Sequence, residues 1–313
     1  MIDPIIKYLL FAACLFASLQ TVVGCSKVGN VPTPDKTIRT VKDDLGRTVR
    51  VPQTVERAVS LAPNLTEMVF AVGAGNRLVG DTTYCNYPDE ARSIRKVGDT
   101  LTPNLETIVA LKPDVVLVST ASQLENFTNV LERNGIAVYV TDPQSIDDVF
   151  KSMVKLGELF GTKEKAENAV IALEDRFDFA RHDKPDRRGD SGGSEPALPR
   201  VFLQISKEPL FTIGKDSFLT DLIKSGGGES VTKDVSGGYP KLSKETAVAL
   251  NPEVIILSDS DDNKEPSEAF KDSPAVRSGR VYRVNADLIS RPGPRLVDAI
   301  EQISKDLHPE KFK

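Results

Sequence analysis

Two stretches of this chain, residues 104–117 (NLETIVALKPDVVL) and residues 243–256 (SKETAVALNPEVII), repeat one pattern at an offset of 139 residues. Each starts with a polar residue that can cap a helix and continues as a short helix with a glutamate in its first turn. A proline then leads into an apolar run typical of a buried strand. We infer two lobes of similar build. Each lobe offers one acidic side chain, Glu106 or Glu245, at an equivalent place, which suits a partner that is itself two-fold symmetric.

The predicted strands indicate a mainly parallel sheet in an α/β protein. Residues 115–118 (VVLV) are apolar at four successive positions, which indicates burial on both faces of a sheet. Residues 64–67 (NLTE) match a capping box, so we expect a helix to begin there with Glu67 satisfying its first backbone amides. Further strands are predicted at 57–62, 77–80, 136–141, 200–205 and 280–284, and helices at 122–133, 217–225 and 295–307.

Helical spacing continues from Ser145 to His182, interrupted at Gly161 and Thr162. A helical segment of this length is unusual inside a compact domain and fits a crossing from one lobe to the other. The predicted organisation is therefore two β/α lobes with mainly parallel sheets joined by one long interdomain helix. Its parts are an N-terminal lobe at 44–143, the interdomain helix at 144–182, a flexible loop rich in Gly, Pro, Ser, Asp and Arg at 183–199, and a C-terminal lobe at 200–313.

The N-terminus has the pattern of an export signal. Lys7 precedes an apolar run too short to span a membrane but typical of a signal peptide, and the VVGC sequence that ends at Cys25 resembles the bacterial lipoprotein signal. We predict a signal peptide at 1–24, a lipidated Cys25 and a polar tether at 25–43. The protein would then lie on the periplasmic or cell-surface face of a membrane, held by acyl chains. A secreted protein with a chance cysteine at this place is the alternative.

Composition excludes several function classes. The net charge of −5 and the scattered basic residues do not form a nucleic-acid footprint. His182 and His308 are the only histidines and neither is in a motif, so a multi-histidine metal site or a Ser-His-Asp centre is not expected. We predict a binding protein with no catalytic residue, metal or cofactor, and not an enzyme. Cys85 is left alone once the signal is removed and Cys25 is acylated, and we expect it to be buried and inert.

Several motifs in a fixed order resemble one family. They are residues 44–49 (DLGRTV), residues 59–67 (VSLAPNLTE), residues 79–88 (VGDTTYCNYP) and the two repeats. Together they are similar to the substrate-binding proteins of ABC importers for iron chelates and cobalamin, over about residues 44–307. The resemblance is nearest to the cobalamin-binding proteins at Tyr84, at residues 202–204 (FLQ) and 209–215 (PLFTIGK), and at residues 291–295 (RPGPR).

The resemblance implies a role for the two repeated glutamates. Glu106 and Glu245 match the pair, one in each lobe, that docks into arginine pockets on the two permease subunits. Carboxylate–guanidinium pairs are short and directional, so two of them fix an orientation. The simpler alternative is that each glutamate only complements its helix dipole, which stabilises a helix by roughly 0.3–1 kcal/mol. The expected partners are an ABC importer permease dimer and its ATPase, with this chain as a monomer.

The resemblance also implies a ligand site in a cleft between the lobes. Tyr84, Phe211 and Tyr239 match aromatic positions of that cleft, and Asp287 and Arg291 match polar ones. Core packing is the simpler interpretation of any lone aromatic residue, and it is our expectation for Tyr87. A local surface ion pair is the alternative for Asp287 and Arg291.

The ligand expected from this resemblance is cobalamin or another corrinoid. The chain has no tryptophan, whereas the cobalamin binders line their cleft with several, and Leu101 occupies one such position. Ferric siderophore binders often place arginines against an anionic chelate, and Arg291 could serve that purpose. A ferric siderophore or haem is therefore the alternative ligand, and an exported sensor or enzyme is the alternative class of protein.

Overall fold

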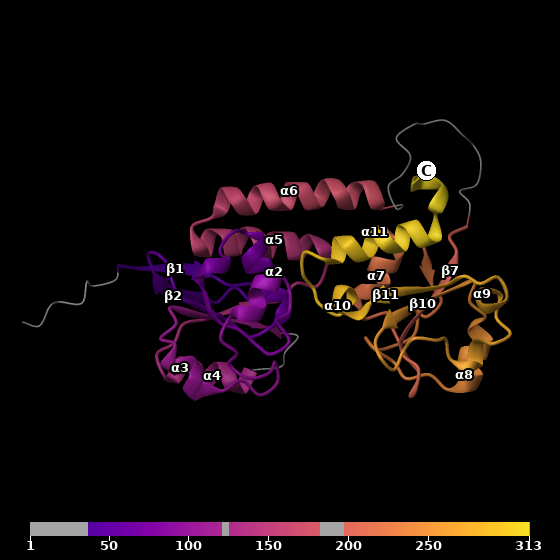
Figure 1. Ribbon diagram of the computed structural model, residues 1–313, viewed down its shortest axis with the longest axis horizontal. Coiled ribbons are helices and arrows are strands. Elements are labelled where there is room, and N and C mark those ends of the chain that lie inside the picture. Colours follow the sequence, from indigo (N-terminus) through magenta and orange to yellow (C-terminus); the bar gives the residue numbers. More distant parts are fainter. Residues whose placement is uncertain (1–36, 121–124, 182–196, 313) are drawn as a thin grey trace, which may run out of the picture. The chain divides into compact units, whose positions relative to one another are not determined.

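The computed structural model describes residues 37–120, 125–181 and 197–312 (Figure 1). The predicted signal peptide, Cys25 and most of the predicted loop at 183–199 lie outside these ranges. The tether predicted at 25–43 needs a correction at its end, because strand β1 (Ile38–Lys42) pairs antiparallel with β2 (Thr48–Pro52). Val41 of β1 packs against the core in which Val49 and Val51 of β2 are buried, so tertiary packing orders the end of a segment that composition alone marks as a linker.

Two sheets of similar build form the frame of the protein. The first is parallel throughout, in the order β4-β3-β5-β6, and the second contains the matching parallel order β9-β7-β10-β11, with β8 added antiparallel to β7. The central strands β5 and β10 are buried almost throughout, which confirms the prediction of mainly parallel sheets. The strands are β3 (Ala58–Ser60), β4 (Leu78–Gly80), β5 (Val115–Ser119), β6 (Val138–Thr141), β7 (Arg200–Ser206), β8 (Phe211–Thr212), β9 (Glu229–Ser230), β10 (Val254–Asp259) and β11 (Val281–Asn285).

The long helical segment is divided into two helices at the break that the sequence predicts. These are α5 (Ile146–Phe160) and α6 (Lys163–Ala180), and the turn between them uses Gly161 at a φ of 71°, which favours glycine. The single interdomain helix expected over 144–182 is thus two helices, because the chain reverses at this turn and α6 packs back along α5 (Figure 1).

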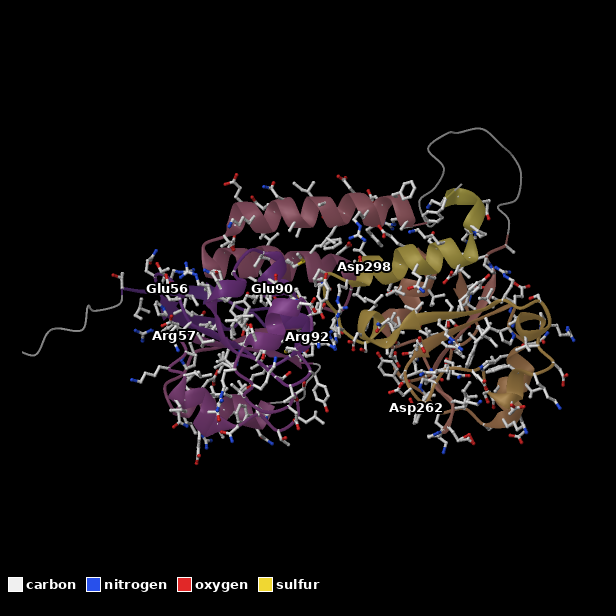
Figure 2. The ribbon with its side chains drawn as sticks, in the orientation of Figure 1. Glu56, Arg57, Glu90, Arg92, Asp262 and Asp298 are labelled. Atoms are coloured by element: carbon white, nitrogen blue, oxygen red, sulfur yellow. The ribbon has the colours of Figure 1, made fainter. Side chains whose placement is uncertain are left out.

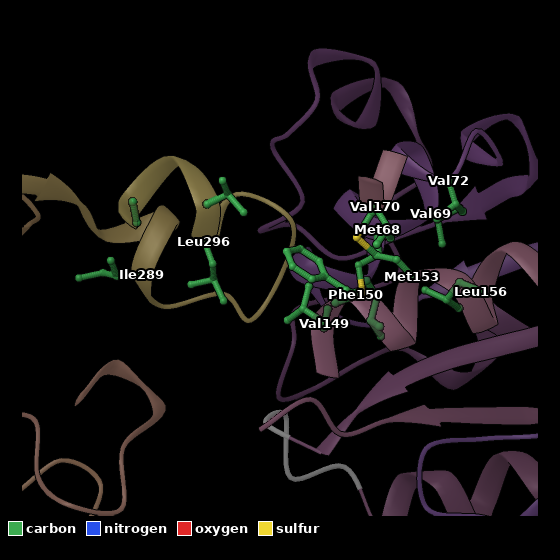
Figure 3. Close-up of a cluster of buried hydrophobic side chains, with 14 of the residues drawn as sticks. Met68, Val69, Val72, Val149, Phe150, Met153, Leu156, Val170, Ile289 and Leu296 are labelled. Carbon is green, nitrogen blue, oxygen red and sulfur yellow. The ribbon is translucent and has the colours of Figure 1, made fainter. Parts of the chain in front are cut away.

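Helices α5 and α6 have different neighbours. Met153 and Leu156 of α5 pack with Met68 and Val69 of α2 (Pro63–Ala71) in the main core, and Val170 of α6 joins them (Figure 3). The far end of α6 instead contacts α11 (Leu296–Leu307), where Ser304 donates a hydrogen bond of 2.8 Å to the carbonyl oxygen of Ala180. Helix α6 therefore carries the connection toward the second sheet.

Shorter helices follow the strands of both sheets. Among the described residues, none of the helices is long and apolar enough to cross a bilayer. Helices α4, α7 and α11 begin and end close to their predicted bounds. The remaining helices are α3 (Leu105–Ala110), α4 (Glu125–Arg133), α7 (Phe218–Ser225), α8 (Lys244–Leu250), α9 (Pro274–Arg277) and α10 (Ala286–Ile289).

Candidate ligand-binding and docking sites

A buried carboxylate joins the two halves of the chain. The side chain of Glu67 on α2 is only 1% exposed and accepts hydrogen bonds from two arginines that follow α10. Arg291 approaches Glu67 Oε1 at 3.0 Å, while Arg295 donates to Oε2 at 2.9 Å and to Oε1 at 2.5 Å. With Asp287, which pairs with Arg291 at 2.7 Å, these residues form the interlobe charge cluster, with two negative and two positive side chains.

The predicted capping box at residues 64–67 is wrong, and this frees Glu67 for the cluster. The N-cap of helix α2 is Ala62, two residues before the predicted cap Asn64, and Pro63 fits the first helical position because no backbone N–H is needed there. The side chain of Asn64 instead donates to the carbonyl oxygen of Pro292 at 3.2 Å. Sequence patterns assigned Glu67 to a helix cap and gave no sign of its ion pairs with the arginines, since these partners lie more than 220 residues away.

Arg291 and Asp287 make further contacts to the first lobe. The amide of Asn86 donates to Asp287 at 3.1 Å, and its oxygen accepts from Arg291 at 2.8 Å. Arg291 also reaches the carbonyl oxygen of Tyr84 at 3.4 Å. The local ion pair considered for Asp287 and Arg291 is present, but it is one part of a larger network. The structure thus brings three of the predicted ligand residues, Tyr84, Asp287 and Arg291, to one place.

Buried polar groups hold the loop that carries Tyr84. Lys96 donates to Asp81 at 2.8 Å and to the carbonyl oxygens of Cys85 and Ala91 at 3.1 Å and 2.9 Å. Burial raises the pKa of Asp81 to about 6, and the neighbouring Lys96 opposes that rise. Tyr84 itself is 59% exposed on this anchored loop.

Cys85 is buried, as predicted. Its thiol lies 3.1 Å from the hydroxyl of Thr66 and 3.3 Å from that of Thr82, and burial raises its pKa. Because the thiolate is the reactive form, we expect negligible maleimide labelling of the folded C14S/C25S variant at pH 7 and complete labelling in denaturant. Mass spectrometry measures both. Rapid labelling without denaturant would contradict an inert thiol.

Tyr87 does not pack in the core, so that expectation is wrong. The residue is 47% exposed, and the guanidinium carbon of Arg295 lies 4.2 Å from the ring centroid. A cation over an aromatic face stabilises by about 0.5–1 kcal/mol at exposed sites. The hydrogen bonds to Glu67 hold the Arg295 guanidinium over the Tyr87 ring. The sequence alone does not reveal this contact.

Phe211 and Tyr239 lie on neighbouring segments of the second lobe. The amide of Thr212 donates to the carbonyl oxygen of Pro240 at 3.2 Å, so the two segments run against each other. A Cβ on Gly214 would meet the carbonyl oxygen of Gly237 at 2.2 Å, so only glycine permits this approach. Tyr239 is 50% exposed and Phe211 partly buried, and their role in ligand binding stays a prediction.

The two repeated glutamates occupy the same position in matched helices. Glu106 is the second residue of α3 and Glu245 the second residue of α8, and both side chains are exposed. Asn104 caps α3 and Ser243 caps α8 by accepting from the amide three residues later. Hydrogen bonds from its own backbone amide and from Ser243 lower the pKa of Glu245, so it is ionised at neutral pH.

The ends of the two helices are held by matching contacts. Arg57, labelled in Figure 2, donates to the carbonyl oxygen of Leu111 at the end of α3 with bonds of 3.0 Å and 2.7 Å, and Arg200 donates to that of Leu250 at the end of α8 at 2.7 Å. An acidic side chain from each repeat accepts from the backbone amide of the same arginine. The distances are 3.0 Å from Asp114 to Arg57 and 3.0 Å from Glu253 to Arg200. The duplication read from the sequence therefore extends to the anchoring of the helices.

Two lobes with matching sheets and a polar junction between them define a two-lobe binding protein. The family model described as periplasmic binding protein matches residues 59–288, and the chain belongs to this family. It is 32% identical over 281 residues to the uncharacterized ABC transporter substrate-binding lipoprotein YvrC of Bacillus subtilis, which covers 88% of this chain and 87% of YvrC.

Two further relatives carry a ligand in their names. The vitamin B12-binding protein of Pectobacterium atrosepticum is 30% identical over 252 residues, covering 80% of this chain and 88% of the relative. The crystal structure of the periplasmic vitamin B12 binding protein BtuF of Vibrio cholerae has a TM-score of 0.66 at 26% identity, covering 83% of this chain and 98% of that structure. This chain is therefore an ABC transporter substrate-binding protein and not an enzyme.

Proposed function

We propose that the protein captures a corrinoid between its two lobes and delivers it to the permease of an ABC importer. Tyr84, Phe211 and Tyr239 would supply aromatic surface for the flat ring, and Asp287 and Arg291 would supply polar contacts. Large flat ligands are bound mainly by apolar and aromatic area with few polar groups. The choice of a corrinoid as the ligand rests on the balanced charge of the interlobe charge cluster.

The cluster favours an uncharged ligand. Glu67 and Asp287 compensate Arg291 and Arg295, so no cation is left over to attract an anion. Arg291 is also largely buried, with 11% of its side chain exposed, and an anionic chelate would have to compete with carboxylates that already hold it. Cyanocobalamin is neutral and edged with amides, whereas haem carries propionates. The relatives named as vitamin B12-binding proteins support the same ligand class.

Delivery would use the two repeated glutamates and a lipid anchor. We infer that Glu106 and Glu245 pair with arginines on the two permease subunits, and that acyl chains on Cys25 keep the monomer at the membrane. The name of YvrC as a lipoprotein supports the anchor. Exposure of both glutamates at equivalent helix positions supports the docking role.

Calorimetric titration tests the ligand. We expect one-to-one, submicromolar binding of cyanocobalamin and no measurable binding of haem or a ferric siderophore. Tyr84→Ala should weaken cobalamin binding about tenfold or more, since covering a large apolar side chain contributes roughly 1.5–3 kcal/mol. Phe179→Ala on α6 is the matched control, because Phe179 is 60% exposed, close to the exposure of Tyr84.

Binding of haem or a ferric siderophore without cobalamin would contradict the corrinoid and leave the transport role in place. Arg291→Ala would then be the next variant to titrate, because that guanidinium would have to leave Glu67 to meet an anion. Equal losses in Tyr84→Ala and Phe179→Ala would contradict the assignment of Tyr84 to the ligand site.

A further inference from the structure

Each docking glutamate has an exposed valine one helical turn away. Val109 follows Glu106 by three residues and Val248 follows Glu245 by three, so each pair shares a helix face. Val109 is 43% exposed and Val248 is 55% exposed. The residue just before each valine, Ile108 or Ala247, is by contrast fully buried. Thus both helices keep one apolar residue for the core and turn a second one outward beside the acid.

The outward valines recur at the same offset of 139 residues as the glutamates. The third residue after each valine has a positive φ, Lys112 at 46° and Asn251 at 44°, so the two segments turn in the same way after the helix. In Figure 1, α3 and α8 both lie on the side of the described chain away from α6. A single exposed valine is unremarkable on a protein surface, but a matched pair beside matched acids is a repeated surface element.

A hollow adjoins the second of these valines. A depression of about 290 Å³ beside α8 is lined by Val248, Ala269 and Phe270 together with the polar and charged residues Lys244, Asn251, Glu268, Lys271, Asp272 and Ser273. A depression of this size can take one side chain of a partner, and the exposed Val248 gives it an apolar edge beside the charged residues. An ionised Glu245 at the start of the same helix would pair with a cation of that partner.

We propose that Val109 and Val248 form, with Glu106 and Glu245, a repeated acid–valine contact for the two permease subunits. This inference rests on the proposed docking function. Each subunit would present an arginine to the glutamate and an apolar side chain to the valine. A partner built from two equal subunits presents the same patch twice, which matches a surface element that this chain carries twice. The valines supply the area that excludes water from the flanking charge pairs.

The test is binding of ligand-loaded protein to the cognate permease–ATPase complex in nanodiscs, measured by surface plasmon resonance. We expect the V109S/V248S variant to bind the complex about tenfold or more weakly, since two partly exposed valines lose their apolar contact. Titration with cyanocobalamin should give the parent affinity, since neither valine belongs to the ligand site. Ile171→Ser on α6 is the matched control, with the same 55% exposure as Val248, and should bind as the parent does.

Two results would overturn the inference in distinguishable ways. If the parent binds the complex and V109S/V248S binds it equally well, the valines are not part of the interface. Docking through the glutamates would then still stand. Failure of the parent itself to bind the complex would overturn the proposed docking function together with this inference. An equal loss in Ile171→Ser would show a general effect of surface polarity and would also overturn it.

Discussion

Replacing Glu67 by alanine should lower the free energy of unfolding by about 3–5 kcal/mol, because the largely buried Arg295 loses the carboxylate that it pairs with, and Arg291 keeps only the partly exposed Asp287. The side chains of Arg291 and Arg295 are only 11% and 14% exposed, so water cannot replace the lost partner well. Urea unfolding followed by circular dichroism measures the change. Corrinoid affinity should fall as well, because Arg291 loses one of the groups that fix its position and keeps only Asp287, Asn86 and the Tyr84 carbonyl oxygen.

Glu90→Ala is the matched control for Glu67→Ala. Glu90 is an exposed acid in the same lobe, labelled in Figure 2, and its loss should change stability by no more than about 0.5 kcal/mol. Replacing Glu67, Arg291 and Arg295 together by leucine and methionine should cost less than Glu67→Ala, because no charge stays buried and unpaired. A Glu67→Ala protein as stable as the control would show that the cluster does not join the lobes.

The E106A/E245A double variant should keep full ligand affinity and lose stimulation of the transporter ATPase. Hydrogen bonds to charged groups contribute about 1.5–3 kcal/mol each, so losing one at each lobe removes most of a transient docking energy. Neither residue contacts the interlobe charge cluster, and each lies at an exposed helix start, so folding should be unaffected. ATP hydrolysis by the reconstituted importer, with titration of the ligand in parallel, measures both effects.

The control for this pair is E164A/E174A, which removes two exposed acids from α6. Stimulation should persist in this variant, because the same net charge is removed away from α3 and α8. Undiminished stimulation by E106A/E245A would contradict docking through these residues and would leave only their favourable interaction with the helix dipoles.

Local patterns were sufficient for most of the fold. The apolar run of β5 predicted burial on both faces, and Gly161 marked the turn between α5 and α6. These signals work because strand burial and helix ends depend on residues that are neighbours in the chain. Segments whose order depends on distant contacts were missed, such as β1, which pairs with β2 and is fixed further by Arg39 donating to the carbonyl oxygen of Leu159.

In the candidate site, too, some residues were predicted from the sequence and others were found only in the structure. The family resemblance predicted Tyr84, Asp287 and Arg291 as neighbours, and the structure brings these three together. Its motifs at residues 59–67 and 79–88 contain Glu67 and Asn86 but gave neither a role in the site, although these two residues hold that group in place. Both were hidden because one fitted a capping motif and the other has the composition of an ordinary loop residue.

The sequence by itself determined the duplication: two cap–helix–strand units, one acid on each, and parallel sheets behind them. These features repeat within the chain, so comparing it with itself is enough to find them. Only the tertiary structure decided that Glu67 meets Arg291 and Arg295, and that Arg291 is therefore not free to meet an anion. An ion pair between residues 224 positions apart leaves no periodic trace, because its energy depends on where the folded backbone places two side chains and not on their spacing in the chain.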